Sequence, residues 1–203
     1  MTLLFLSTVI LTGPAWCSQL CYFGAFDNLA SGKRPARYPL KNKYAIKTSL
    51  LILIIIVTLL LRWLKVNVIT TTIIAITFGL GGIAVMVFLS RGKGKMIHCI
   101  LYCPIGTIVN LLRLLNPFRM VIDKECTTCM RCTSVCKYDA LNLQDIRNRK
   151  PGRTCTNCGD CIPSCKEEYI SYRFFRLQPH NARNLWLFLT VSLHAVFLAL
   201  ARI

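Results

Sequence analysis

Long runs of apolar residues, separated by short polar stretches, dominate the chain outside its middle. Two runs, about residues 44–64 and 68–90, are each long enough to cross a bilayer, which needs roughly 20 apolar residues. A third run, residues 184–203, is mostly apolar but contains His194, and a shorter one covers about residues 2–16. The pattern predicts a polytopic α-helical membrane protein with about four transmembrane helices.

The remaining sequence contains two further regions. Apolar residues recur every three or four positions over about residues 104–115, which predicts an amphipathic helix lying on the membrane surface. Most acidic residues fall within residues 120–175, which predicts a small domain outside the bilayer. We therefore expect a membrane domain over residues 1–119, the small domain over 120–175, and a closing transmembrane helix over 184–203.

Composition and charge support this membrane setting. The chain has 203 residues, of which 54% are hydrophobic and 16% charged, whereas a soluble domain carries about 25% charged residues. The formal net charge is +17, and Asp27 is the one acidic residue outside residues 120–175. Basic residues beside apolar runs are typical of the cytoplasmic flanks of membrane helices and argue against a nucleic-acid partner.

The distribution of Lys and Arg also predicts an orientation. Basic residues gather between residues 33 and 47 and between residues 91 and 95, whereas the turn at 62–67 holds few. The positive-inside rule places residues 91–183 on the cytoplasmic side of the cytoplasmic (inner) membrane, with lipid as a partner. Aromatic residues near the expected helix ends fit the membrane interface: Trp16, Trp63 and Trp186.

Eight of the twelve cysteines form a repeated motif. Both copies read C-x2-C-x2-C-x3-C, and the second follows the first at an offset of 29 residues. This is the spacing of [4Fe–4S] ligands in bacterial ferredoxins, in which the fourth cysteine of each run binds the other cluster. We therefore predict two [4Fe–4S] clusters with crossed ligands: Cys126, Cys129, Cys132 and Cys165 for one, and Cys155, Cys158, Cys161 and Cys136 for the other.

This motif predicts that residues 120–175 form a small α+β ferredoxin domain of the bacterial two-[4Fe–4S] type. Zinc is disfavoured because zinc sites usually have one C-x2-C pair followed by a gap in the sequence, rather than four closely spaced cysteines. Disulfides are disfavoured because we expect this domain to face a reducing compartment. Ferredoxin runs normally end in Cys-Pro, but here Lys137 and Lys166 follow the last cysteines. Each lysine could raise the potential of a nearby cluster or could lie on a solvated face.

The other four cysteines form two C-x3-C pairs: Cys17 with Cys21, and Cys99 with Cys103. Residues i and i+4 of a helix share one face, so each pair could present two sulfurs together. The expected topology places both pairs at the same membrane surface. Four converging thiols could hold a third iron–sulfur cluster, a copper ion or a zinc ion. They could also form redox-active disulfides or be structural, and the spacing leaves these alternatives open.

The order of these motifs resembles the membrane polyferredoxin family that includes NapH, the C-terminal part of NosR, and CcoG. The resemblance rests on two cysteine pairs, the helical pair between them and the doubled ferredoxin run, and it extends to about Tyr172. Pro104 after Cys103 matches the C-x3-C-P motif of that family, whereas Tyr22 follows Cys21.

The resemblance implies an electron-transfer subunit that relays electrons between the membrane quinone pool and redox partner subunits of a membrane complex. Two alternatives are a copper reductase acting in metal-centre assembly and a redox-sensing membrane regulator. The sequence has no dinucleotide fingerprint or catalytic triad, so we do not expect a stand-alone enzyme. His194 is a candidate quinone contact because ionisable residues within membrane helices are often functional.

Overall fold

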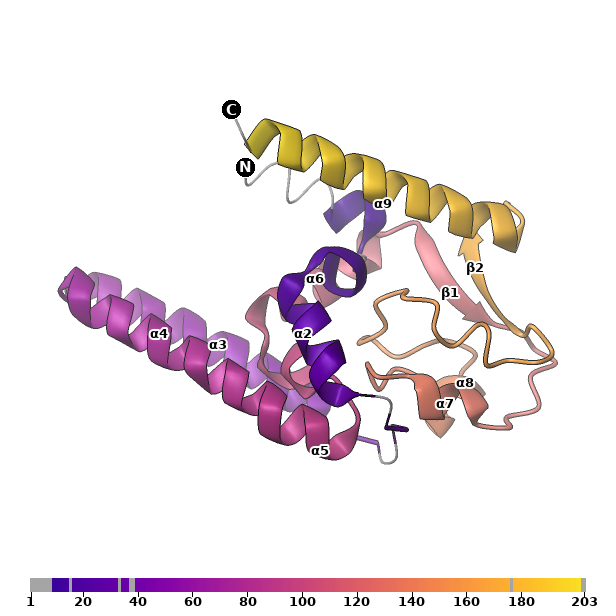
Figure 1. The fold of residues 1–203 in the computed structure, drawn as a ribbon, viewed down its shortest axis with the longest axis horizontal. Helices are drawn as coiled ribbons and strands as arrows, with labels where there is room; N and C mark the ends of the chain where they lie inside the picture. The colour runs from indigo at the N-terminus through magenta and orange to yellow at the C-terminus, as the bar shows by residue number, and fades with distance from the viewer. Residues whose placement is uncertain (1–8, 15, 33, 37–38, 176, 202–203) are drawn as a thin grey trace.

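The computed structural model describes the chain in five segments: residues 9–14, 16–32, 34–36, 39–175 and 177–201. Figure 1 shows a long helical hairpin on one side, a small domain built on β1 and β2 on the other, and a middle layer containing α2 and α6. Helix α9 runs across the small domain, and its far end projects toward the same side as the hairpin.

The hairpin consists of α3 (Lys43–Trp63) and α4 (Val68–Ala84), and its second arm continues through η2 (Val85–Ser90) and α5 (Arg91–Lys93). In hydrocarbon every backbone polar group must be satisfied internally, which favours helices for such apolar runs. The Asn67 side chain accepts a hydrogen bond from the Ile69 N–H and caps the start of α4. Most apolar side chains of α3 are exposed on the protein, as expected for a helix that faces lipid.

Among the described residues, three helices are long and apolar enough to cross a membrane: Lys43–Trp63, Val68–Lys93 and Pro179–Leu200. These correspond to the three long runs of the sequence. The fourth expected helix, residues 2–16, falls largely outside the described residues, since residues 1–8 and 15 are not among them. Residues 9–12 are helical, and Gly13 follows with a φ of 61°. A fourth membrane span therefore stays a prediction.

The small domain contains an antiparallel pair of strands, β1 (Phe118–Ile122) and β2 (Ile170–Phe174), with Met120 opposite Tyr172. Two short helices, α7 (Arg131–Val135) and α8 (Leu143–Arg147), lie between them in the chain. Alternate residues of both strands are buried and form the core together with two of the ferredoxin cysteines. The core of the domain is thus built around the cysteine loops.

Helix α9 (Pro179–Ala201) begins earlier than residue 184 and packs against β2. Ala182 and Trp186 are fully buried in the core of the small domain, and Trp186 Nε1 donates a hydrogen bond of 3.0 Å to the Thr12 carbonyl oxygen. The expectation that Trp186 lies at the membrane interface is therefore wrong. The first turns of this apolar helix bury their side chains in protein before the helix continues beyond the domain.

The middle layer has two halves with the same local structure. Each half is a π-helical turn, one extended residue and an α-helix. The first comprises η1 (Trp16–Leu20) and α2 (Tyr22–Ser31), and the second comprises η3 (His98–Tyr102) and α6 (Pro104–Leu112), which ends in η4 (Arg113–Leu115). The extended residues are Cys21 and Cys103, with φ of −81° and −73° and ψ of 119° and 115°. The two C-x3-C pairs thus occupy equivalent positions.

Candidate metal centres

The two ferredoxin runs share one backbone conformation. Thr128 and Met130 in the first run are left-handed, with φ of 55° and 62°, and Asn157 and Gly159 at the same positions of the second run have φ of 56° and 87°. Left-handed residues between right-handed ones turn successive N–H groups inward and form concavities that suit an anionic group. The repeat therefore includes the loops that would wrap a cluster as well as the cysteines.

A cavity in the small domain is lined by all four cysteines of one predicted crossed set: Cys136, Cys155, Cys158 and Cys161. Its other walls include the apolar side chains of Met120 and Leu141. Burial raises the pKa of Cys136 to about 12, and it also raises the pKa of Cys161. Four sulfur donors in an apolar enclosure are the environment that iron–sulfur clusters occupy.

The other crossed set lies around Cys132. Burial raises the pKa of Cys132, and the neighbouring Cys126, Cys129 and Cys165 contribute to the increase. Within the part of the chain that the structure describes, no three His, Cys, Asp or Glu side chains meet closely enough to hold a single metal ion. One predicted set lines a common cavity and the other is linked by electrostatic interactions, and the ligation of iron by either set stays a prediction.

The four remaining cysteines meet in the middle layer. Burial raises the pKa of Cys17 to about 12, with further increases from Cys103 and Cys21. Burial also raises the pKa of Cys99, to which Asp27, Cys103 and Cys17 contribute. Such thiols are protonated at neutral pH unless a metal or cluster stabilises the thiolates. The two C-x3-C pairs are therefore electrostatic neighbours and form a partly buried cluster, the four-thiol site.

Each pair belongs to a longer motif, C-x3-C-x2-G, and the first of its two glycines, Gly24, is required sterically. A Cβ on Gly24 would lie 2.5 Å from the Cys17 carbonyl oxygen, and a Cβ on Gly106 would lie 3.4 Å from the Cys99 carbonyl oxygen. The Cys103 Sγ accepts a hydrogen bond of 3.4 Å from the Gly106 N–H. The repeated spacing is visible in the sequence, but the close backbone approach that requires glycine is visible only in the fold.

Asp27 and His98 lie beside Cys99. The buried Asp27 carboxylate accepts a hydrogen bond of 3.0 Å from the Cys99 N–H. The His98 ring packs so closely on α4 that a Cβ on Gly82 would lie 2.9 Å from it. Gly82 therefore allows the turn that carries Cys99 to dock on α4.

Two hydrogen bonds connect the four-thiol site with the ferredoxin domain. Tyr138 donates to the Cys17 carbonyl oxygen at 3.3 Å, and Ser18 donates to the Thr156 carbonyl oxygen at 3.1 Å. Tyr138 and Thr156 both line the cavity of the ferredoxin cysteines. The first C-x3-C pair therefore lies against one of the two ferredoxin sets, that of Cys136.

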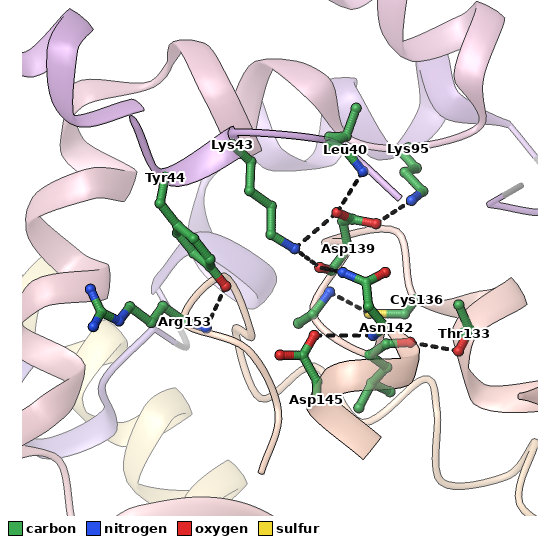
Figure 2. A network of polar contacts seen from close by, with 12 residues as sticks. Leu40, Lys43, Tyr44, Lys95, Thr133, Cys136, Asp139, Asn142, Asp145 and Arg153 are labelled. Carbon is green, nitrogen blue, oxygen red and sulfur yellow. Dashed lines mark hydrogen bonds and ion pairs between the residues drawn. The ribbon is translucent and has the colours of Figure 1, made fainter. Parts of the chain in front are cut away.

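Buried ion pairs at Asp139 fasten the same junction (Figure 2). One carboxylate oxygen binds Lys43 Nζ at 2.9 Å and the Leu40 N–H at 3.1 Å, and the other binds Lys95 Nζ. Burial by itself would raise the pKa of Asp139, but hydrogen bonds from Lys95 and Lys43 hold it below its ordinary value. Two segments of the membrane domain are thereby attached to one ferredoxin residue.

The lysines that follow the ferredoxin runs differ in environment. Lys137 Nζ donates to Asn28 Oδ1 at 2.9 Å and to the Gly32 carbonyl oxygen at 2.6 Å. These acceptors lie at the C-terminal end of α2, where a cation is favourable. Lys166 is exposed. Lys137 therefore connects the ferredoxin domain with α2.

His194, the candidate quinone contact, lies in α9 next to Trp16. The two rings meet edge-on with 6.1 Å between their centroids. Among the described residues His194 Nδ1 is buried and has no hydrogen-bond partner. Because Trp16 directly precedes Cys17, His194 approaches the first C-x3-C pair, and quinone binding there stays a prediction.

Comparison with known proteins identifies one matching family and several similar sequences. A family described as "4Fe-4S binding domain" matches residues 1–41 and 71–120, which contain both C-x3-C pairs and none of the doubled run. The chain is 24% identical over 181 residues to the ferredoxin-type protein NapH of Haemophilus influenzae, covering 80% of this chain and 63% of NapH. It is 23% identical over 177 residues to the uncharacterized protein MJ0749 of Methanocaldococcus jannaschii, covering 81% of this chain and 66% of that protein.

The chain therefore spans less than two thirds of the length of these two relatives. No solved structure gives a significant match. The apolar helices indicate a membrane protein, and the family match together with the gathered cysteines indicates iron–sulfur clusters as cofactors. The family match and the similarity to NapH support a membrane polyferredoxin-like family with a 4Fe-4S binding domain.

Proposed function

We propose that this chain is a membrane-bound iron–sulfur electron-transfer subunit that relays electrons between the quinone pool and a redox partner subunit. It lies in the cytoplasmic (inner) membrane with the ferredoxin domain on the cytoplasmic side. The distribution of Lys and Arg supports this orientation. When bound, [4Fe–4S] clusters supply one-electron carriers whose potentials depend on ligation, hydrogen bonding and burial.

The observation that carries the proposal is the contact between the two kinds of thiol site. Tyr138 lines the ferredoxin cavity and also donates a hydrogen bond to the backbone of Cys17. Electron tunnelling weakens steeply with distance, so a relay requires redox centres held in adjacent parts of the protein. The junction at Cys17 and Tyr138 provides this proximity between the membrane layer and the ferredoxin domain.

A third iron–sulfur cluster at Cys17, Cys21, Cys99 and Cys103 is part of the proposal. The family match supports it, because the matched residues include these four cysteines and exclude the ferredoxin set. The repeated C-x3-C-x2-G motif also supports it, because both halves have the same local structure and Cys17 interacts with Cys103 as well as with Cys21. Thiolate donors suit soft metal centres, including iron–sulfur clusters.

The chain's own residues would position the centres and exclude water. Met120 and Leu141 cover the ferredoxin thiols with apolar surface. The Ala140 N–H donates to Cys136 Sγ at 3.3 Å, and hydrogen bonds of this kind stabilise negative charge on a ligating sulfur. The ion pairs of Asp139 keep the ferredoxin domain at a fixed distance from the middle layer.

An apolar groove in the membrane domain supports quinone as the substrate class. It has a volume of about 640 Å³ and lies among α3, η2 and η3. Its lining is mostly aliphatic, and it includes Tyr102, the residue before Cys103. A groove of this shape suits an isoprenoid tail. His194 does not line the groove; it lies beside Trp16 and is a separate candidate contact for quinone.

The first test is the content of iron, acid-labile sulfide, copper and zinc in the full chain purified from membranes without oxygen. Three clusters correspond to about twelve irons with matching sulfide. Replacing Cys17, Cys21, Cys99 and Cys103 together by Ser should lower the iron content to about eight and leave the ferredoxin spectrum intact. In a second experiment, a reduced quinone added to the wild-type protein in lipid nanodiscs should bleach the visible iron–sulfur absorption.

Other results would favour one of the alternative functions or overturn the proposal. About eight irons with one copper per chain, the copper lost in the fourfold Ser variant, would favour a copper reductase in metal-centre assembly. Partner affinity that changes with oxidation state, without quinol turnover, would favour a redox-sensing regulator. Zinc without sulfide would overturn the electron-transfer proposal.

A further inference from the structure

Lys47 is a buried cation beside the four-thiol site. It lies in the first turns of α3, and 5% of its surface is exposed. Its Nζ donates a hydrogen bond of 3.3 Å to the Cys99 carbonyl oxygen. Gly106 lies next to it, since a Cβ there would be 3.5 Å from Lys47 Nζ, at ordinary van der Waals contact. The side chain therefore ends where the second C-x3-C-x2-G motif turns.

The electrostatic neighbours of Lys47 are thiols. Cys17, Cys103 and Cys99 all interact with its ammonium group. Two buried carboxylates have other partners: Asp27 accepts a hydrogen bond from the Cys99 N–H, and Asp139 forms ion pairs with Lys43 and Lys95. No ion pair of Lys47 exists among the described residues, whereas Lys43, one turn earlier on α3, is paired.

The buried ammonium group of Lys47 requires negative charge nearby. A buried ammonium loses its hydration, and this cost is offset only by nearby negative charge or ample hydrogen bonding. Four protonated thiols or two disulfides are neutral and provide no such charge. Four thiolates around an iron–sulfur cluster leave the centre net negative, so a thiolate-held cluster supplies the negative charge that Lys47 lacks.

We propose that Lys47 is the buried counter-ion of an anionic redox centre held by Cys17, Cys21, Cys99 and Cys103, and that it raises the reduction potential of that centre. The inference rests on the third centre of the proposed function. Reduction adds one negative charge close to the ammonium group. Because the attraction is stronger for the more negative state, the cation stabilises the reduced form relative to the oxidised one.

Three variants of the full chain test this role: Lys47→Gln, which removes the charge but keeps a hydrogen-bonding group, Lys47→Arg, which keeps the charge, and Lys41→Gln. Lys41 is an exposed lysine shortly before α3, so solvent screens its charge. The readouts are iron and sulfide content and the midpoint potential of the third centre, from a redox titration followed by electron paramagnetic resonance. The fourfold Ser variant identifies the signal of that centre.

We expect a more negative midpoint potential in Lys47→Gln, and wild-type potentials in Lys47→Arg and Lys41→Gln. Selective loss of the third centre in Lys47→Gln, with its retention in Lys47→Arg, would equally support the counter-ion. An unchanged potential at full occupancy in Lys47→Gln would overturn it. Loss of the centre in Lys47→Arg as well would also overturn it, because the charge is then present.

The outcomes separate this inference from the proposed function. A wild-type chain with about eight irons, no copper and four alkylatable thiols at the pairs would refute the anionic centre. The ferredoxin part of the relay would remain. A wild-type chain without sulfide would refute the relay itself. With about twelve irons in every variant and identical potentials, only the role of Lys47 fails.

Discussion

Lys43 and Asp139 form a buried ion pair with an Nζ–Oδ2 distance of 2.9 Å, which joins the first residue of α3 to the ferredoxin domain. Lys95, which follows α5, binds the other carboxylate oxygen. Two buried cations therefore share one anion (Figure 2). The placement of the ferredoxin domain on the middle layer depends strongly on this single carboxylate.

Replacing Asp139 by Asn should destabilise the protein markedly. The substitution leaves Lys43 and Lys95 buried without a charge partner, and breaking a buried pair in this way costs about 3–5 kcal/mol. Denaturant unfolding of the purified protein would measure the loss. Glu167→Gln is the control, because this exposed position should change stability by less than about 0.5 kcal/mol. Equal stability of the Asp139→Asn variant and the wild type would contradict the role of the junction.

The contribution of Asp139 should not depend on pH across the neutral range. The pKa of Asp139 is lowered in the folded protein, because the hydrogen bonds from both lysines outweigh its burial. A carboxylate of this kind stabilises the fold above its unfolded pKa of about 4, and the effect is lost as the pH falls through the folded value. The stability difference between wild type and Asp139→Asn should stay constant from about pH 8 to about pH 5. A difference that shrinks within this range would mean that the carboxyl has a raised pKa instead.

The sequence was sufficient for features that depend on local spacing. The apolar runs predicted the three long helices, because length and hydropathy alone decide which segments can cross a bilayer. The doubled cysteine run predicted the crossed sets, and the four cysteines of the set that includes Cys136 line one cavity. The binding of iron at these thiols remains to be measured.

Features that depend on tertiary packing could not be predicted in this way. An apolar face looks the same whether it meets lipid or protein, so Trp186 was placed at the interface although the core covers it. Nothing in the local sequence marks Lys47 or Asp139, because their partners are distant in sequence. Gly24 is visible in the sequence, but the need for glycine there follows from the Cys17 carbonyl oxygen that the fold places beside it.

Alanine at Gly24 should disturb the four-thiol site more than alanine at Gly106. The added Cβ would lie 2.5 Å from the Cys17 carbonyl oxygen in the first case and 3.4 Å from the Cys99 oxygen in the second. We expect a cost of about 1–3 kcal/mol for Gly24→Ala, together with loss of iron beyond the ferredoxin clusters. Gly79→Ala in α4 is the control, because its Cβ would meet nothing within 4 Å. Similar effects at Gly24 and Gly79 would refute the backbone argument.

Trp186→Ala should detach the start of α9 from the ferredoxin core. Removing a fully buried tryptophan costs about 3–5 kcal/mol, and the hydrogen bond to Thr12 is lost as well. Thermal unfolding and limited proteolysis between β2 and α9 would report the change. Trp63→Ala is the matched control, because this side chain is 82% exposed at the far end of the hairpin. Equal melting temperatures for the two variants would place Trp186 outside the core.

Cys165→Ser should damage the cluster predicted at Cys126, Cys129 and Cys132 rather than that of its own run. The fold supports this expectation, since Cys132 interacts with Cys165 as well as with its own neighbours in the run. Low-temperature electron paramagnetic resonance of the reduced proteins should therefore show the same lost signal in Cys165→Ser and Cys132→Ser. Cys136→Ser and Cys161→Ser should share the other loss, because both cysteines line one cavity. If Cys165→Ser instead matched Cys161→Ser, each run would bind its own cluster and the crossed arrangement would be wrong.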